Sequence, residues 1–197
     1  MKNSDLFSKF CSTERLNDMF GKEDYYWYLS HSAFVDTCIK YTAEKIHELG
    51  DNLSVLDLGC GLGDLLKYLP ETHYYCGIDG SNIAIAKAIN KWEHRPNTDF
   101  GVQRIEDFAE RTDLVSFDVI LFGNILVFSK NGERSSFIEL FVNRTKAKYV
   151  VVYDLQRTRT HDVAARYELL SSKVFDIKLD KLKTEVKKHR KVEVYKV

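Results

Sequence analysis

The stretch Ser54-Val55-Leu56-Asp57-Leu58-Gly59-Cys60-Gly61-Leu62-Gly63-Asp64 decides the fold. Its first five residues form a short apolar run typical of a buried strand, and helical periodicity begins after Asp64. The glycines between them let the backbone turn sharply and approach a ligand closely, where a Cβ atom would clash. The stretch therefore predicts a strand, a glycine turn and a helix, with the turn at the carboxyl edge of a sheet, where ligands bind in doubly wound folds.

Helices and strands alternate along the rest of the chain. Apolar residues recur at helical spacing over residues 32–49, before Pro70, over Ser81–Asn90 and over Phe137–Phe141. Short apolar runs predict parallel strands at Ser54–Leu58, His73–Ile78, Phe100–Val102, Phe117–Phe122 and Tyr149–Tyr153. Beyond a helix predicted over Val163–Leu170, the segments Val174–Leu179 and Val192–Val197 predict an antiparallel pair.

This alternation predicts a single α/β domain over residues 32–197. Its sheet is Rossmann-like, doubly wound and seven-stranded, mostly parallel, with an antiparallel carboxyl-terminal strand. Residues 1–31 lack a clear period and are rich in aromatic side chains, which predicts an amino-terminal lid or appendage. Within it, the cluster from Tyr25 to Tyr28 with His31 either closes over a bound ligand or packs as an ordinary helix.

Composition argues against several classes of partner. The 29 Lys and Arg residues balance 29 Asp and Glu residues, so no net charge steers the chain toward nucleic acid or a membrane. The four cysteines form no C-x-x-C pair, and no early apolar run is long enough for a signal peptide or a membrane span. We therefore expect a reduced cytoplasmic setting with no membrane partner and no metal site. We interpret the one local basic tract as a solvated hairpin; its residues are Lys178, Lys181, Lys183, Lys187, Lys188, Arg190 and Lys191.

The order of the glycines discriminates between cofactors. Dinucleotide sites favour G-x-G-x-x-G, whereas this turn is G-x-G-x-G and follows an acid, Asp57. A second acid, Asp79, ends the next strand roughly twenty residues past the glycines, where a carboxylate can bridge two ribose hydroxyls. Such an acid suits any ribosyl cofactor, so only the glycine spacing argues against a dinucleotide here.

Three segments, Val55–Gly63, Ile78–Ser81 and Phe117–Phe122, resemble the class I S-adenosylmethionine-dependent methyltransferase family. The resemblance spans about residues 32–197. It implies methyl transfer with S-adenosylmethionine as the cofactor and S-adenosylhomocysteine as the product. Because no large insert follows the fourth or fifth strand, we expect a small-molecule acceptor, such as a sugar or a natural-product intermediate. The expected assembly is a monomer or homodimer.

The resemblance also implies roles for individual residues. The glycine turn lies against the methionine part of the cofactor, and Asp57 orients its amino-acid end. Asp79 holds the ribose, and the end of the fourth strand borders the methyl group. The implied cofactor-binding set is Tyr28, Asp57, Gly59, Cys60, Gly61, Asp79, Gly80, Ser81, Arg104, Ile105, Glu106, Gly123 and Asn124.

One position departs from the family pattern. The family often places an acid after the third strand to receive the adenine amino group, and the matching residue here is Arg104. A shift of two or three residues in the alignment would give this role to Glu106 or Asp107. Without such a shift, the backbone at Ile105 is left to contact the adenine.

Catalysis of methyl transfer relies mainly on alignment of the acceptor with the leaving sulfur. An oxygen acceptor also needs a general base, and the candidates are His161, His31 and Asp154. Cys60 has no histidine at a recognisable spacing, so we interpret it as a structural thiol. Two other functions stay open: a non-catalytic binding protein with a methyltransferase-like fold, and an NAD-dependent oxidoreductase, which the glycine spacing disfavours.

Overall fold

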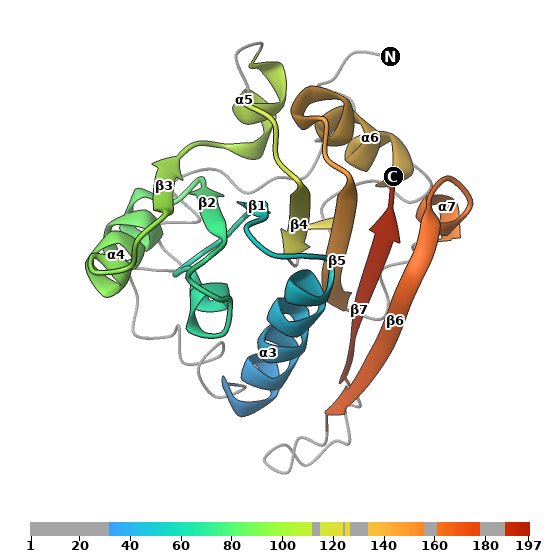
Figure 1. The fold of residues 1–197 in the computed structure, drawn as a ribbon, viewed down its shortest axis with the longest axis horizontal. Helices are drawn as coiled ribbons and strands as arrows, with labels where there is room; N and C mark the ends of the chain where they lie inside the picture. The colour runs from blue at the N-terminus through green and yellow to red at the C-terminus, as the bar shows by residue number, and fades with distance from the viewer. Residues whose placement is uncertain (1–31, 112–114, 124, 127–133, 156–160, 178–187) are drawn as a thin grey trace.

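The computed structural model describes residues 32–111, 115–123, 125–126, 134–155, 161–177 and 188–197. Within them, one seven-stranded sheet carries helices on both faces, with β3 and α4 at one edge and β6 at the other (Figure 1). The predicted lid at residues 1–31 lies outside the described residues, so it stays a prediction.

The sheet has the order β3-β2-β1-β4-β5-β7-β6. The first five strands along the chain pair in parallel, and β7 pairs antiparallel with both β5 and β6. The predicted doubly wound, mostly parallel sheet with an antiparallel carboxyl end is therefore confirmed. The strands are β1 Ser54–Leu58, β2 Tyr74–Asp79, β3 Thr98–Val102, β4 Val119–Gly123, β5 Tyr149–Leu155, β6 Glu168–Ile177 and β7 Lys188–Lys196.

The helices differ more from the sequence prediction. The helix predicted before Pro70 is a short 3₁₀ turn, and the helix after β3 was not predicted. The helical segments are α3 Ser32–Glu48, η3 Asp64–Lys67, α4 Asn82–Trp92, α5 Ile105–Glu110, α6 Arg134–Thr145 and α7 His161–Ala164.

Alternating strand residues form two separate hydrophobic cores. On one face, Val55 of β1 and Leu121 of β4 pack with apolar residues of α3 and η3. On the other face, Leu56 and Phe122 pack with apolar residues of α5, α6 and α7. Because side chains alternate between the two faces along a strand, these four residues show which face of the sheet each other residue of β1 and β4 points to.

Two predictions about the carboxyl-terminal region are wrong. The helix predicted over Val163–Leu170 ends at Ala164, and β6 begins at Glu168, because pairing with β7 satisfies the backbone of this segment. A β-bulge between Leu169 and Ser171 interrupts the alternation that would have indicated a strand. In the basic tract, Arg190 is buried rather than solvated.

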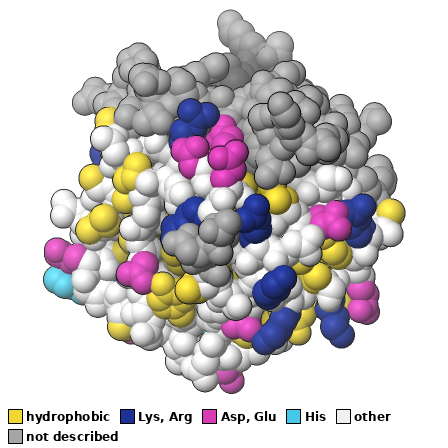
Figure 2. Space-filling model, turned by 90° about the horizontal axis from the view of Figure 1, so that it is seen from above, with side chains coloured by type: hydrophobic (Ala, Val, Ile, Leu, Met, Phe, Trp, Pro, Cys, Tyr) yellow, Lys and Arg dark blue, Asp and Glu magenta, His cyan; other side chains and the backbone are white. Residues whose placement is uncertain are grey.

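The described surface is mixed in charge. On the face shown in Figure 2, lysine and arginine side chains lie among aspartate and glutamate side chains. Cys38, Cys60 and Cys76 are free thiols. Among the described residues, no helix combines the length and apolar character needed to cross a membrane.

Two histidines, His47 and His73, lie next to each other near the start of β2. His73 is 2% exposed, and its Nδ1 atom accepts a hydrogen bond from the Leu53 N–H at 3.0 Å. Its Nε2 atom lies 3.3 Å from Nδ1 of His47, so His73 donates there as a neutral imidazole. Burial, and then the neighbouring His47, lower the pKa of His73 from its ordinary 6.5.

We expect the stability of the protein to fall as the pH drops below about 6.5, where the unfolded chain takes up a proton that folded His73 excludes. His73→Asn keeps an acceptor for Leu53 but cannot titrate. This variant should lose about 1 kcal/mol, or roughly 2–4 °C in unfolding temperature, near pH 7. It should also depend less on pH than the wild type in thermal unfolding between about pH 7 and pH 5.

The matched control is His94→Asn, because the side chain of His94 is 92% exposed. It should keep the pH dependence of the wild type. An unchanged slope in the His73 variant would contradict the assignment.

Candidate functional site

The glycine turn after β1 is bonded to the end of β2. Gly59, Gly61 and Gly63 have φ angles of 74°, 55° and 67°, a left-handed conformation that favours glycine. The N–H groups of Gly59 and Cys60 both donate to the Ile78 carbonyl, at 2.8 and 3.0 Å. The turn is therefore held at the carboxyl edge of the sheet, as the sequence predicted.

Asp79 connects this turn to α4. The side chain is 6% exposed, Oδ2 accepts from the Gly61 N–H at 3.0 Å, and Oδ1 accepts from the Ser81 N–H at 2.9 Å. Burial raises the pKa of Asp79, although the two N–H groups counteract the rise. Each oxygen retains acceptor capacity, because a carboxylate offers about four lone-pair sites.

A pocket lies beside the turn on the α3 face of the sheet. Asp57, Gly123 and Tyr153 lie in the carboxyl halves of three adjacent strands, on the same face as Val55, Leu121 and Val151. Among the described residues, a Cβ atom built on Gly123 would meet only Oδ1 of Asp57, at 4.0 Å, so these residues leave space beside the end of β4. The pocket, of about 50 Å³, is lined by Ile39, Thr42, Asp57, Gly59, Cys60, Asp64, Leu65, Leu121, Gly123 and Tyr153.

Asp57 is the most strongly perturbed carboxyl group of this pocket. It is 5% exposed, and its Oδ2 atom accepts from the hydroxyl of the fully buried Tyr75 at 2.8 Å. Burial raises the pKa of Asp57 to about 7 against the opposing hydrogen bond from Tyr75, and the charges of Asp79 and Asp64 add to the rise. The pocket therefore favours a ligand that brings positive charge or hydrogen-bond donors.

Two other predicted residues have structural partners. The Ser81 side chain caps α4 by accepting from the Ala84 N–H at 3.1 Å. The Cys60 sulfur packs where a Cβ atom on Gly77 would lie 2.9 Å away. Burial, and then the charges of Asp57 and Asp79, raise the pKa of Cys60 well above its ordinary value, which agrees with a structural thiol.

The residues considered for adenine lie at the start of α5. The Gln103 N–H donates to the Asp79 carbonyl at 3.0 Å, which keeps this segment beside the end of β2. Arg104 pairs with Glu106 at 2.9 Å. The Ile105 side chain is buried in the core of the α6 face, which leaves its backbone as the part able to face a ligand.

The three candidate bases are not brought together within the described residues. Asp154 is buried, but it lies on the sheet face opposite to Tyr153. His161 begins α7, and its side chain lies outside the described part, as do Tyr28, His31 and Asn124. No sequence pattern indicated Tyr75, Thr42 or Tyr153 as site residues, because these side chains reach the site only through sheet pairing and packing.

Comparison with known proteins points to methyltransferases. Residues 55–148 match a family model described as a methyltransferase domain. The sequence has no significant match among curated proteins. Among solved structures, the chain is similar to magnesium protoporphyrin IX methyltransferase from Synechocystis PCC 6803 with bound S-adenosylmethionine. Sequence identity is 15% and the TM-score is 0.64, over 96% of this chain and 99% of that one.

Two further structures share the fold. N-methyltransferase NodS from Bradyrhizobium japonicum WM9, in complex with S-adenosyl-L-homocysteine, has 14% identity and a TM-score of 0.67, over 94% of this chain and 98% of that one. The [4+2]-cyclase SpnF has 15% identity and a TM-score of 0.62, over 82% of this chain and 80% of that one. The predicted resemblance to class I methyltransferases is therefore confirmed.

We expect Asp57→Asn to stabilise the ligand-free protein at about pH 8. The unfolded chain ionises this carboxyl near pH 3.8 and the folded protein near 7, so stability falls as the pH rises between these values. The interval corresponds to about 4 kcal/mol at most. Urea unfolding should show the variant more stable at about pH 8, and the gain should shrink toward about pH 4.

Asp51→Asn serves as the control, since the Asp51 side chain is 79% exposed, and it should show no such gain. Equal stability differences at both pH values would count against a buried, titrating Asp57.

Proposed function

We propose that this chain, which carries a methyltransferase domain on a class I methyltransferase fold, transfers a methyl group from S-adenosylmethionine to a small-molecule acceptor. The observation that carries the proposal is the position of Asp79, buried and bonded to both the glycine turn and the start of α4. A carboxylate fixed there can accept hydrogen bonds from two ribose hydroxyls.

The residues of the site fit this cofactor. Asp79 would hold the ribose, and Asp57 would face the ammonium group of the methionine part, whose positive charge favours an ionised carboxylate. The described residues around Gly123 leave room beside them. The pocket of about 50 Å³ accommodates one end of such a ligand, so the rest would lie along the carboxyl edge. When bound, the cofactor supplies a sulfonium-activated methyl group.

A small acceptor fits the dimensions of the chain. It covers nearly the whole of two methyltransferase neighbours, and the name of one of them gives magnesium protoporphyrin IX as its acceptor. The acceptor pocket would be formed by the ends of β4 and β5, by α3 and by the predicted lid at residues 1–31. A sugar or a natural-product intermediate remains the proposed class of acceptor.

The second candidate is a protein that keeps this fold without transferring a methyl group. The likeness to SpnF favours it, since that neighbour is named for a [4+2]-cyclase reaction. Fold likeness alone does not separate the two, because one fold supports several reactions. Release of S-adenosylhomocysteine during turnover with an acceptor would distinguish them. The NAD-dependent alternative is weaker, because the glycine spacing differs from that of dinucleotide sites.

We propose His161 ahead of Asp154 as the general base for an oxygen acceptor. His161 begins α7, which follows β5 along the chain and precedes β6. Asp154 lies on the face opposite to Asp57 and Tyr153 and sits in register with Lys191 of β7. Asp154 is therefore turned away from the pocket that Asp57 and Tyr153 line.

Calorimetric titration tests the cofactor assignment. We expect micromolar binding of S-adenosylmethionine and S-adenosylhomocysteine, about −8 kcal/mol, and no comparable binding of NAD. Asp79→Asn removes a charge-assisted acceptor and should weaken binding roughly 10- to 100-fold.

Asp99→Asn is the matched control, because this carboxylate on β3 is exposed and accepts a hydrogen bond from the Tyr74 hydroxyl. It should bind as the wild type does. Binding of NAD alone, or of none of the three compounds, would refute the proposal.

Turnover measurements test the base. In a screen of hydroxyl-bearing acceptors followed by release of S-adenosylhomocysteine, His161→Ala should lower kcat about 100-fold or more and leave cofactor affinity unchanged. Asp154→Asn should have the smaller effect on kcat. The reverse order would assign the base to Asp154.

A further inference from the structure

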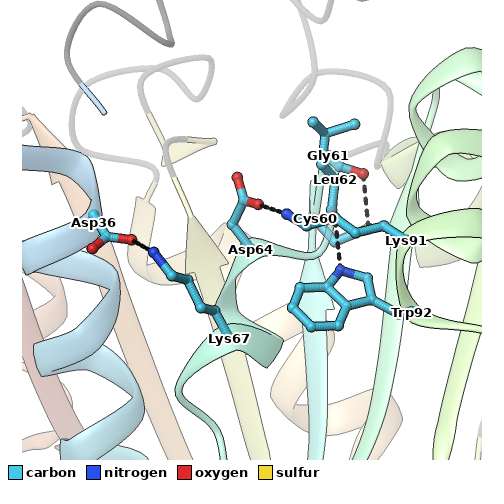
Figure 3. Close-up of polar contacts among 8 residues, drawn as sticks. All are labelled: Asp36, Cys60, Gly61, Leu62, Asp64, Lys67, Lys91 and Trp92. Atoms are coloured by element: carbon cyan, nitrogen blue, oxygen red, sulfur yellow. Dashed lines mark hydrogen bonds and ion pairs between the residues drawn. The ribbon is translucent and has the colours of Figure 1, made fainter. Parts of the chain in front are cut away.

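The last two residues of α4, Lys91 and Trp92, contact the residues before and after Gly63 in the glycine turn. The Trp92 Nε1–H donates to the Leu62 carbonyl at 2.9 Å, and Lys91 forms an ion pair with Asp64 (Figure 3). Lys91 also lies over the Trp92 ring, with Nζ 4.9 Å from its centroid. A helix that begins beside Asp79 therefore ends in contact with the glycine turn.

The indole belongs to a row of aromatic side chains beneath the turn, which we call the aromatic floor: Tyr75, Phe100 and Trp92. A Cβ atom on Gly63 would lie 2.9 Å from the Phe100 ring and 3.1 Å from Trp92 Nε1. The Phe100 ring meets the Tyr75 ring edge-on at 5.7 Å, and the Tyr75 hydroxyl donates to Asp57. The floor thus contacts both the glycine turn and the carboxyl group at its start.

The Leu62 carbonyl lies at the point where the turn has most conformational freedom. It is flanked by Gly61 and Gly63, and glycine populates left- and right-handed conformations about equally well. The Gly63 N–H of the Leu62–Gly63 peptide donates to the Cys60 carbonyl at 3.0 Å, and the Trp92 N–H binds its carbonyl oxygen, so the indole supplies the second of two hydrogen bonds that select its orientation. The Leu62–Gly63 peptide comes directly after Gly61, whose N–H donates to the Asp79 carboxylate. A change in the orientation of this peptide would therefore also move the Gly61 N–H that binds Asp79.

We propose that Trp92 is a positioning residue for the cofactor, acting through the Leu62 carbonyl to hold the glycine turn in its binding conformation. The inference rests on the proposed function, because the ligand of the turn is taken to be S-adenosylmethionine or its product. Trp92 does not line the pocket, so its effect is on binding geometry and not on contact with the reacting atoms.

Trp92→Phe tests the role of the donor, because it keeps an aromatic ring in the floor and removes the N–H. We expect S-adenosylhomocysteine to bind about five- to tenfold more weakly to this variant in calorimetry, the range for loss of one hydrogen bond. Tyr74→Phe is the control: it also removes one aromatic donor, to the exposed Asp99, and should bind as the wild type does.

A spectroscopic measurement separates positioning from simple packing. The chain has two tryptophans, Trp27 and Trp92, so Trp27→Phe leaves Trp92 as the only indole emitter. Its emission should change when S-adenosylhomocysteine is added, with the same midpoint as a calorimetric titration of the same Trp27→Phe protein. Equal affinity of Trp92→Phe and wild type, or constant Trp92 emission during binding, would overturn the proposal. Failure of the wild type itself to bind would instead refute the proposed function.

Discussion

The end of β2 fixes the conformation of the glycine turn, and the rest of the site depends on that constraint. The Ile78 carbonyl and the Asp79 carboxylate together accept from the N–H groups of three consecutive turn residues, 59–61. The parallel register, which places Leu58 opposite Ile78, brings these donors and acceptors together. Because they are largely buried, breaking one leaves a polar group without water, which costs about 1–3 kcal/mol.

The side of the sheet on which the pocket forms follows from strand alternation. Asp57, Gly123 and Tyr153 share a face with the apolar residues that pack on α3, so the core of that face continues into the pocket. Their neighbours Leu58, Phe122 and Val152 belong to the opposite core. A change of one residue in register would exchange the two sets, so the packing that stabilises the sheet also specifies the site.

The sequence was sufficient to predict features that are formed by neighbouring residues. It was insufficient to predict features that depend on pairing between distant strands. The strand, glycines and acid of residues 54–64, and Asp79 after the second strand, follow from short patterns. The segment Val163–Leu170 was misassigned because its apolar residues fit a helical period, whereas pairing with β7 and the β-bulge decide its structure. Tyr75, Tyr153 and Trp92 carry no local pattern, and only the folded chain brings them to residues 57–63.

Charge at the site links stability to binding. Burial raises the pKa of Asp57, and the negative charges of Asp79 and Asp64 raise it further. Within the described part of the chain, the donors to these two buried side chains are a tyrosine hydroxyl and two backbone N–H groups, none of which carries a positive charge. Ionising both carboxyls in the empty site is therefore unfavourable, because a buried charge needs a compensating partner. A cationic ligand supplies that compensation, so the arrangement that weakens the empty protein strengthens the bound one.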